Sequence, residues 1–234
     1  MSVLILGHGL LGSELVKQTR WDYISRHKNN FDFIDVNSYS SLLYDYDTIV
    51  NSISYTNTYD DNKQKHWDVN YKAVVDLVDM CNIYNKKLIH ISTDYIYANS
   101  ITNASEEDVP VHCRNWYSYT KLLADGYVQL KSNNFLLLRG THKEEPFLYD
   151  SAWTDQVGNF DYVSVISKLI IRLIEKKVDG IYNIGTEVKT MYDLARKTKV
   201  DVNPIKKMIN ISTPTNLVMN LKKLNDTLGD GNGN

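Results

Sequence analysis

Cysteine and proline are scarce in this chain of 234 residues, which contains four prolines and two cysteines, Cys81 and Cys113. Two cysteines so far apart exclude a disulfide framework and a zinc site built from several thiolates. Such sparing use of cysteine is typical of the reducing cytoplasm. The histidines show no metal-ligand spacing either. We therefore expect a cytoplasmic protein without a metal site.

An excess of charge of either sign is missing as well, because 26 basic and 28 acidic residues leave a net charge of -2. No broad basic field attracts nucleic acid or membrane phosphates, so neither is an expected partner. The N-terminal apolar run is short and has no basic lead, which indicates neither a signal peptide nor a membrane span. A hydrophobic content of 43% is ordinary for a globular chain and excludes wholesale disorder.

Short apolar runs alternate with stretches of helical periodicity over the first 140 residues. Continuous runs predict buried strands at residues 3–6, 23–24, 32–36, 48–53, 87–92 and 134–139. Helical spacing of apolar residues predicts helices at residues 10–19, 70–84 and 117–131. Apolar strands separated by helices are typical of a parallel sheet that is covered on both faces and connected by right-handed crossovers. The sequence therefore predicts an α/β protein with a doubly wound parallel sheet, the Rossmann fold.

The pattern changes after residue 140. Residues 163–176 form a strongly amphipathic helical stretch, residues 180–185 indicate a strand, and residues 190–197 a short helix. We expect the Rossmann domain over residues 1–140 and a small α/β cap, interleaved with it, over residues 141–228. The glycine-rich residues 229–234 are expected to form a flexible tail.

A glycine-rich turn, GHGLLG, joins the first predicted strand to the first predicted helix. In this spacing Gly7 allows a tight turn, Gly9 lets a pyrophosphate approach the bare backbone, and Gly12 permits close helix packing. The helix N-terminus adds free N–H groups and the positive end of its dipole. We predict a dinucleotide cofactor bound here, with Leu10 and Leu11 among its contacts. A chance glycine-rich turn is the alternative.

The end of the second predicted strand indicates which dinucleotide is bound. An acidic residue there accepts the ribose 2′-OH of NAD, whereas an arginine accommodates the 2′-phosphate of NADP. The strand is followed by Arg26, which favours NADP(H) and leaves NAD(H) as the second choice; a solvated basic turn is the alternative. Asp35 and Val36, at the end of the predicted strand 32–36, are expected near the adenine. A turn-forming role for Asp35 is equally consistent with the sequence.

A second group of residues carries chemistry: STDY at residues 92–95, and Tyr117 with Lys121 in the helix 117–131. Residues four apart share one helix face, so we predict that Lys121 lowers the pKa of the Tyr117 phenol towards neutrality. Such a phenol exchanges a proton with a carbonyl or alcohol oxygen, and Thr93 is placed to bond the same oxygen. Tyr119 lacks a lysine four residues further on.

The order of these motifs resembles that of the extended short-chain dehydrogenase/reductase superfamily, above all the dTDP-4-dehydrorhamnose reductases and related nucleotide-sugar reductases and epimerases. The resemblance covers roughly residues 1–140 and is carried by TIVNSISYTN, WDVNYKAVVDL, KLIHISTDYIYAN, SEEDVPVHCRNWYSYTKLLAD and FLLLRG. The stretch FDYVSVISKLIIRLIEKKVDGIYNIG resembles the family's C-terminal helix and strand more weakly. The glycine turn is one residue shorter than the family's, and the C-terminal region, where the family holds the sugar nucleotide, is abbreviated.

The resemblance implies three sets of site residues. The catalytic positions are Thr93, Tyr117 and Lys121, the last of which also holds the nicotinamide ribose. The residues that line the cofactor after the strand 48–53 are Asn51, Ser52 and Ile53. The residues expected near the substrate are Asp94, Tyr95 and Arg139. The alternatives are that Asp94 caps its strand, that Tyr95 packs in the core, and that Arg139 pairs with a structural acid.

The resemblance implies an NADP-dependent reductase of a 4-keto-6-deoxy nucleotide sugar, in which hydride passes to C4 and Tyr117 donates the proton. One alternative is an NAD-dependent nucleotide-sugar epimerase or dehydratase. Another, suggested by the abbreviated C-terminal region, is a non-catalytic dinucleotide-binding subunit. A nucleoside-diphosphate sugar is the expected partner. A homodimer that pairs through the helices 70–84 and 117–131 is also consistent with the pattern.

Overall fold

The computed structural model describes residues 1–29, 31–97, 102–108, 115–208 and 212–229. Cys113 and residues 230–234 of the predicted tail lie outside these described residues. Within the described part of the chain, no helix is long and apolar enough to cross a membrane.

A six-stranded sheet forms the centre of the fold, in the order β10-β5-β4-β3-β1-β2, and all neighbouring strands run parallel. Its strands are β1 (Val3–Leu6), β2 (Asp22–Ile24), β3 (Thr48–Asn51), β4 (Lys87–Ile91), β5 (Phe135–Arg139) and β10 (Gly180–Asn183). All residues of β1 and β3 are buried, because helices cover both faces of the sheet. The chain builds outwards from β1 to β2 and then returns to β3, so a topological switch point lies beside β1. The predicted doubly wound parallel sheet is confirmed.

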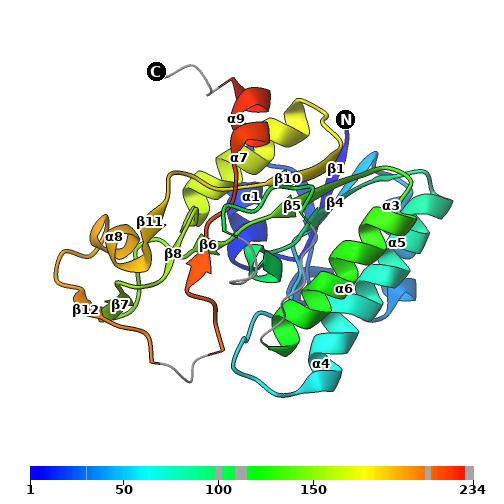
Figure 1. Ribbon diagram of the computed structural model, residues 1–234. Helices are drawn as coiled ribbons and strands as arrows, with labels where there is room; N and C mark the ends of the chain where they lie inside the picture. The colour runs from blue at the N-terminus through cyan, green and yellow to red at the C-terminus, as the bar shows by residue number, and fades with distance from the viewer. Residues whose placement is uncertain (30, 98–101, 109–114, 209–211, 230–234) are drawn as a thin grey trace.

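Helices cover the sheet on both sides (Figure 1). They are α1 (Leu10–Thr19), α2 (Arg26–Asn29), α3 (Ser40–Leu43), α4 (Lys63–Trp67), α5 (Ala73–Ile83), α6 (Trp116–Lys131), α7 (Val163–Glu175), α8 (Met191–Arg196) and α9 (Lys222–Leu228). Single turns of other helix types are η1 (Val36–Ser38), η2 (Asp68–Lys72, a π-turn between α4 and α5) and η3 (Asp94–Tyr97). Helix α1 packs on α7, and α5 packs on α6. The apolar core is accordingly split between the two faces, with Leu15 and Ile170 in one cluster and Leu77 and Ala124 in the other.

Beyond β5 the chain contributes to two layers. Strand β10 extends the central sheet and α7 covers it, whereas short strands pair outside it. These are β6 (His142–Lys143) with β9 (Asp161–Tyr162), β7 (Ser151–Trp153) with β12 (Asn203–Ile205), and β8 (Val157–Gly158) with β11 (Lys189–Thr190) and β13 (Asn216–Leu217). A core of its own, which includes Phe160 and Leu194, holds this smaller layer together. In Figure 1, β7, β12 and α8 lie at the end of the molecule away from α5.

The strand predicted at residues 32–36 is wrong. This segment forms a turn, in which the carbonyl of Asp32 accepts the N–H of Asp35 at 3.1 Å and the Asp32 side chain accepts the N–H of Ile34 at 3.2 Å. Phe31 and Phe33 are nevertheless buried. Their alternation looks like a strand, but side-chain bonds of aspartate to the local backbone favour a turn.

Candidate functional site

A cavity of about 850 Å³ lies between the carboxyl ends of the central strands and the smaller layer. Its lining includes Gly9 from the glycine turn, Ser52 after β3, Thr93 after β4, and Tyr117 and Lys121 from α6. Ligands of open α/β sheets bind at this edge, next to the switch point. The structure thus brings residues of both predicted motifs to one cavity.

The glycine turn has the geometry that a pyrophosphate requires. Gly7 has a φ of +96°, which favours glycine, and a Cβ added to Gly12 would lie 2.3 Å from the carbonyl oxygen of Gly7. Gly9 has open space where a Cβ would stand, and no side chain caps α1 at this residue. The bare N–H groups at the start of the ten-residue helix α1 therefore fit an anionic diphosphate.

Substitution of Gly12 by alanine is expected to lower the free energy of unfolding by about 1–3 kcal/mol, because the new methyl group meets backbone that cannot move aside. Gly126→Ala is the matched control, since Gly126 lies within α6 and a Cβ added there would meet nothing within 4 Å. Alanine there is expected to raise stability by up to about 1 kcal/mol. Urea denaturation of both variants measures the difference, and losses of equal size would contradict the packing role of Gly12.

The basic turn after β2 lies outside the cavity lining. Arg26 is exposed and begins the short helix α2. The ring of Tyr23 contacts side chains on both sides of this turn. The ring of His8 stacks on it with 4.2 Å between ring centres, and Lys28 Nζ lies 4.1 Å from the centre of the Tyr23 ring. A 2′-phosphate held by Arg26 remains a prediction for this exposed turn.

Asp35 and Val36 also lie away from the cavity lining. The Asp35 side chain accepts the N–H of Asn37 at 3.1 Å and caps the turn η1. Val36 is half-buried and packs against the apolar core on the α5 side. Of the two interpretations of Asp35, the turn-forming one describes its contacts in this structure.

The segment after β3 contributes two of its three predicted residues to the cavity. Ser52 and Ile53 line it, and Ser52 Oγ donates to the carbonyl of Leu6 at 2.8 Å. Asn51 is completely buried and does not line the cavity, so its place on the cofactor stays a prediction. Its Oδ1 accepts the N–H of Ile53 at 3.1 Å, and its Nδ2 lies 3.2 Å from Nδ1 of His90.

Tyr117 lies in the first turn of α6, where a capping box between Asn115 and Ser118 starts the helix. Burial raises the pKa of Tyr117 to about 12, although its hydrogen bond with Thr93 lowers it. The prediction that Lys121 lowers this pKa is therefore wrong in this structure. A phenol with so high a pKa stays protonated at neutral pH, which is the state that a proton donor requires.

Lys121 is almost fully buried, at 1% exposure. Its Nζ donates to the carbonyl of Ile91 at 2.7 Å and lies 3.3 Å from Nε2 of His90. Burial lowers the pKa of Lys121 to about 8, whereas the charge of Asp125 raises it. The amine thus sits near its titration point at mildly alkaline pH.

Asp94 is fully buried and does not line the cavity, so its substrate contact stays a prediction. Its Oδ1 accepts from Oγ1 of Thr141 at 2.6 Å and from Oγ1 of Thr93 at 3.4 Å. Burial raises the pKa of Asp94 to about 6. Its neighbour Tyr95 does line the cavity and packs edge-on to Tyr117, with 5.8 Å between ring centres. Asp94 therefore holds the hydroxyl of Thr93 from the buried side of the cavity wall. Tyr95 remains a candidate substrate contact.

Arg139, which is predicted near the substrate, lies in a buried network of hydrogen bonds. It is 1% exposed, and its guanidinium donates twice to Asp125, from Nη2 at 2.8 Å and from Nε at 3.0 Å. It further donates to the phenol of Tyr97 and to the carbonyl of Glu106. The alternative of a structural acid describes its contacts in this structure, because Arg139 at the end of β5 pairs with Asp125 of α6.

Asn70 is a buried residue that supports the wall of the cavity and that the sequence analysis missed. It lies in the π-turn η2, and its Oδ1 accepts from the N–H of Tyr55 at 2.7 Å and from Oγ of Ser54 at 3.0 Å. Its Nδ2 donates to the Tyr55 carbonyl at 3.0 Å and to Oγ1 of Thr120 at 3.3 Å. Asn70 therefore ties the cavity-lining loop after β3 to α6. A buried asparagine within an apolar helical period was the available signal.

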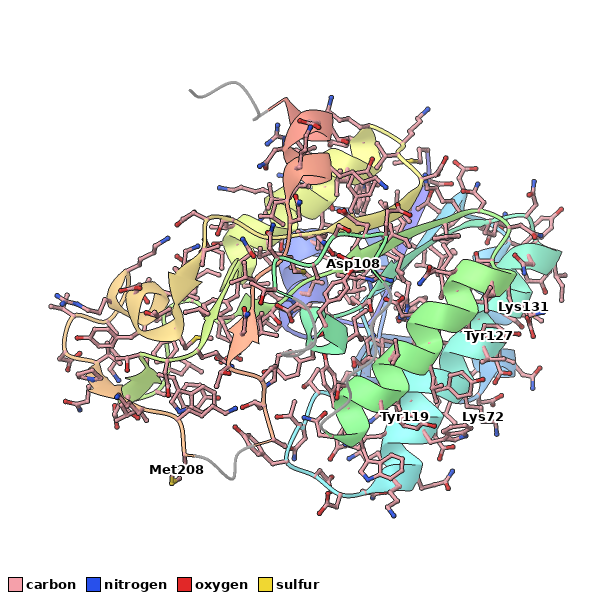
Figure 2. The ribbon with its side chains drawn as sticks, viewed as in Figure 1. Lys72, Asp108, Tyr119, Tyr127, Lys131 and Met208 are labelled. Carbon is pink, nitrogen blue, oxygen red and sulfur yellow. The ribbon has the colours of Figure 1, made fainter. Side chains whose placement is uncertain are left out.

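Four aromatic side chains that the site prediction does not include also line the cavity, namely Tyr59, Phe147, Tyr149 and Trp153. Single-sequence patterns could not assign them, because Tyr59, Phe147 and Tyr149 lie in loops and Trp153 ends the short strand β7. Tyr119, in contrast, is exposed and packs edge-on to Trp116, in agreement with its lack of a lysine partner. Figure 2 shows Tyr119, Tyr127 and Lys131 along α6, beside Lys72 of the neighbouring helical segment.

Among the described residues, no cluster of three or more His, Cys, Asp or Glu side chains is arranged to hold a metal ion.

Comparison with known proteins gives a consistent result. Residues 1–142 match the family described as RmlD substrate binding domain. The spore coat polysaccharide biosynthesis protein SpsK of Bacillus subtilis is 25% identical over 224 residues, which cover 82% of this chain and 76% of that protein.

Solved structures share the fold across almost the whole chain. A hypothetical dTDP-4-dehydrorhamnose reductase from Sulfolobus tokodaii has a TM-score of 0.79 at 21% identity, covering 97% of this chain and 94% of that one. The dTDP-4-dehydrorhamnose reductase of Bacillus anthracis, solved in complex with NADP, has a TM-score of 0.82 at 19% identity, covering 96% and 91%.

Proposed function

The chain belongs to the RmlD substrate binding domain family, within the extended short-chain dehydrogenases/reductases, and on that premise we propose that it is an NADP-dependent reductase of a 4-keto-6-deoxy nucleotide sugar. One observation carries the proposal: Thr93, Tyr117 and Lys121 line the same cavity as Gly9 at the start of α1. The NADP complex of the Bacillus anthracis reductase and the name of the Bacillus subtilis relative, which refers to polysaccharide synthesis, support the same cofactor and substrate class.

Each residue has a distinct task in the proposed reaction. The glycine turn binds the diphosphate of the cofactor at the N-terminus of α1, and the bound cofactor supplies the hydride. Thr93 holds the carbonyl oxygen of the sugar, and Tyr117 donates a proton to that oxygen as its negative charge develops. The four further aromatic residues that line the cavity offer surfaces on which the nucleotide base stacks.

Turnover of sugar nucleotides tests the proposal. The purified protein is incubated with NADPH and a dTDP-4-keto-6-deoxy sugar, and the loss of NADPH absorbance is followed. Oxidation of NADPH with formation of the 4-hydroxy sugar is the expected result. Redox-neutral conversion of a sugar nucleotide by protein that retains NAD would favour an epimerase or dehydratase. Binding of dinucleotide without turnover of any keto sugar would favour a non-catalytic subunit.

Arg26→Ala is expected to raise KM for NADPH about tenfold or more and to leave KM for NADH nearly unchanged. The physical reason is the loss of charge-assisted hydrogen bonds to a 2′-phosphate that NADH lacks. Steady-state kinetics with both cofactors measure the change, and Arg196→Ala, an exposed arginine on α8, is the control. Equal effects of Arg26→Ala on both cofactors would contradict the assignment.

A further inference from the structure

A row of three buried polar side chains runs behind the cavity, and each comes from a different element. Asn51 ends β3, His90 lies in β4, and Lys121 lies in α6. Asn51 and His90 are both fully buried. His90 uses both ring nitrogens in this row: Nδ1 lies 3.2 Å from Asn51 Nδ2, and Nε2 lies 3.3 Å from Lys121 Nζ.

The Asn51 amide determines where His90 carries its proton. The amide oxygen is already engaged, because it accepts the N–H of Ile53 at 3.1 Å, so the NH₂ group faces the imidazole. An amide nitrogen only donates, and Nδ1 of His90 therefore accepts. A neutral imidazole that accepts at Nδ1 carries its proton at Nε2. Burial, together with the charge of Lys121, lowers the pKa of His90 well below its usual value, so the ring stays neutral.

The Nε2–H of His90 is thus directed at the amine of Lys121. An ammonium has three donors and no acceptor, so it would face this N–H donor against donor. A neutral amine has a lone pair for it and can still donate to the Ile91 carbonyl at 2.7 Å. The row therefore favours the neutral amine. To accommodate the ammonium, either Asn51 must turn and lose the Ile53 bond, or His90 must present its proton to the amide NH₂.

We propose that His90, fixed in one tautomer by Asn51, is a positioning residue that sets the protonation state of Lys121. The other groups around the amine of Lys121 do not set its protonation state in this way. Asp125, one turn further along α6, is engaged with Arg139 of β5, and Tyr117, one turn before it, is a protonated phenol. Asn51 of β3 carries no charge.

The kinetic consequence rests on the proposed function. After Tyr117 has given its proton to the substrate oxygen, Lys121, which lines the same cavity, is the source of the proton that the phenolate regains. The N–H bond of the ammonium breaks, the phenol O–H re-forms, and the resulting neutral amine accepts the hydrogen bond from His90. Solvent protons then restore the ammonium for the next turnover. An ammonium with the ordinary pKa of lysine would release its proton less readily.

Asn51→Asp reverses the tautomer with a change of one side-chain group. One carboxylate oxygen still accepts the N–H of Ile53, and the other now accepts a hydrogen bond from the N–H of His90 Nδ1. The Nε2 lone pair then faces Lys121 and accepts from its ammonium. We expect the pKa of Lys121, followed by NMR titration of its side chain, to rise by about one unit or more. The basic limb of the kcat/KM profile is expected to move by the same amount.

Two comparisons make this test decisive. Asn225→Asp adds the same charge on the exposed surface of α9, and it should leave the pKa of Lys121 and the pH profile unchanged. In the wild-type protein, ¹⁵N NMR of the His90 ring, assigned with His90→Gln, should show the proton on Nε2 throughout the neutral range. This second measurement requires neither turnover nor a folded Asn51→Asp variant.

A proton on Nδ1 of His90 in the wild-type protein would overturn the proposal. An unchanged Lys121 pKa in folded Asn51→Asp would do so too. Failure of the wild-type protein to reduce any keto sugar would end the proposed function, and the two NMR measurements would still decide the role of His90.

Discussion

Tyr117→Phe is expected to lower kcat for reduction of the keto sugar by about 10²–10⁴-fold, the usual contribution of a positioned proton donor. The variant loses only the phenol oxygen. The ring remains, so its edge-on packing against Tyr95, with 5.8 Å between ring centres, is retained. The glycine turn is not touched, and the dissociation constant for NADPH should therefore stay within about a factor of two, since the binding contacts are unchanged.

Steady-state kinetics and NADPH fluorescence titration measure these two quantities separately. Tyr119→Phe is the matched control, because Tyr119 lies on the same helix two residues further on and is exposed. The control should retain the kcat of the wild type. Full turnover by Tyr117→Phe would leave the cavity without its proposed proton donor and would contradict the mechanism.

The pH dependence follows from the same group of residues. The phenol of Tyr117, whose pKa burial raises to about 12, remains protonated through the neutral range. Its own ionisation therefore does not limit the rate at physiological pH. Lys121, whose pKa burial lowers to about 8, loses its charge as the pH rises through that value. We therefore expect the activity to decline as the pH rises through about 8, as Lys121 loses its charge, and the pH profile of kcat checks this.

The central sheet could be predicted from the sequence because its strands are continuous apolar runs. Strands β1, β3, β4 and β5 are buried on both faces, and such strands show no competing pattern. Residues 32–36 were misassigned because Phe31 and Phe33 alternate with polar residues as they would in a strand. The hydrogen bonds from the backbone to the side chains of Asp32 and Asp35 determine the local structure. The spacing of apolar residues contains no information about these bonds.

The motifs of the candidate site could be predicted from the sequence. Which of their side chains line the cavity and which are buried behind it could not. Sequence spacing singles out four features as candidates: the glycine turn, Thr93, Tyr117 and Lys121. Each was recognised because it stands at the distance from its neighbours, or at the strand end, that its proposed chemistry requires. Asp94 and Arg139 are adjacent to the same strand ends, and sequence alone does not say which side chains turn inwards. The error about the Tyr117 pKa has the same origin: burial raises it, and burial is a property of the folded chain.

The second large effect expected concerns the pair of Asp125 and Arg139. Asp125→Ala is expected to lower the free energy of unfolding by about 3–5 kcal/mol, because it leaves the guanidinium of Arg139 buried without its counter-charge. Both side chains are at most 1% exposed. Asp125 also accepts from Oγ of Ser92 at 2.7 Å and from Nε2 of Gln129 at 2.7 Å, so these donors lose a partner as well.

Urea denaturation measures the loss, with Asp226→Ala as the control. Asp226 forms an ion pair with Lys222 on the surface of α9, where both partners are exposed, and its removal should change stability little. A loss no greater than that of the control would show that water reaches Arg139 in the native state and would contradict its burial.

Replacing both members of the buried pair separates two contributions to stability: the cost of burying a charge and the attraction between the two charges. In Asp125→Leu with Arg139→Met, no charge is left in the core, so the double variant should be more stable than Asp125→Ala alone. The loss that persists should come from the hydrogen bonds of both removed side chains. Tyr97 and Glu106 no longer receive the guanidinium, and Ser92 and Gln129 no longer donate to the carboxylate. Ser92, which loses its bond to Asp125, directly precedes Thr93. The double variant should therefore fold and yet hold Thr93 less firmly, with a reduced kcat, because the pair that stabilises the end of β4 also positions the residue that we propose to bond the substrate oxygen.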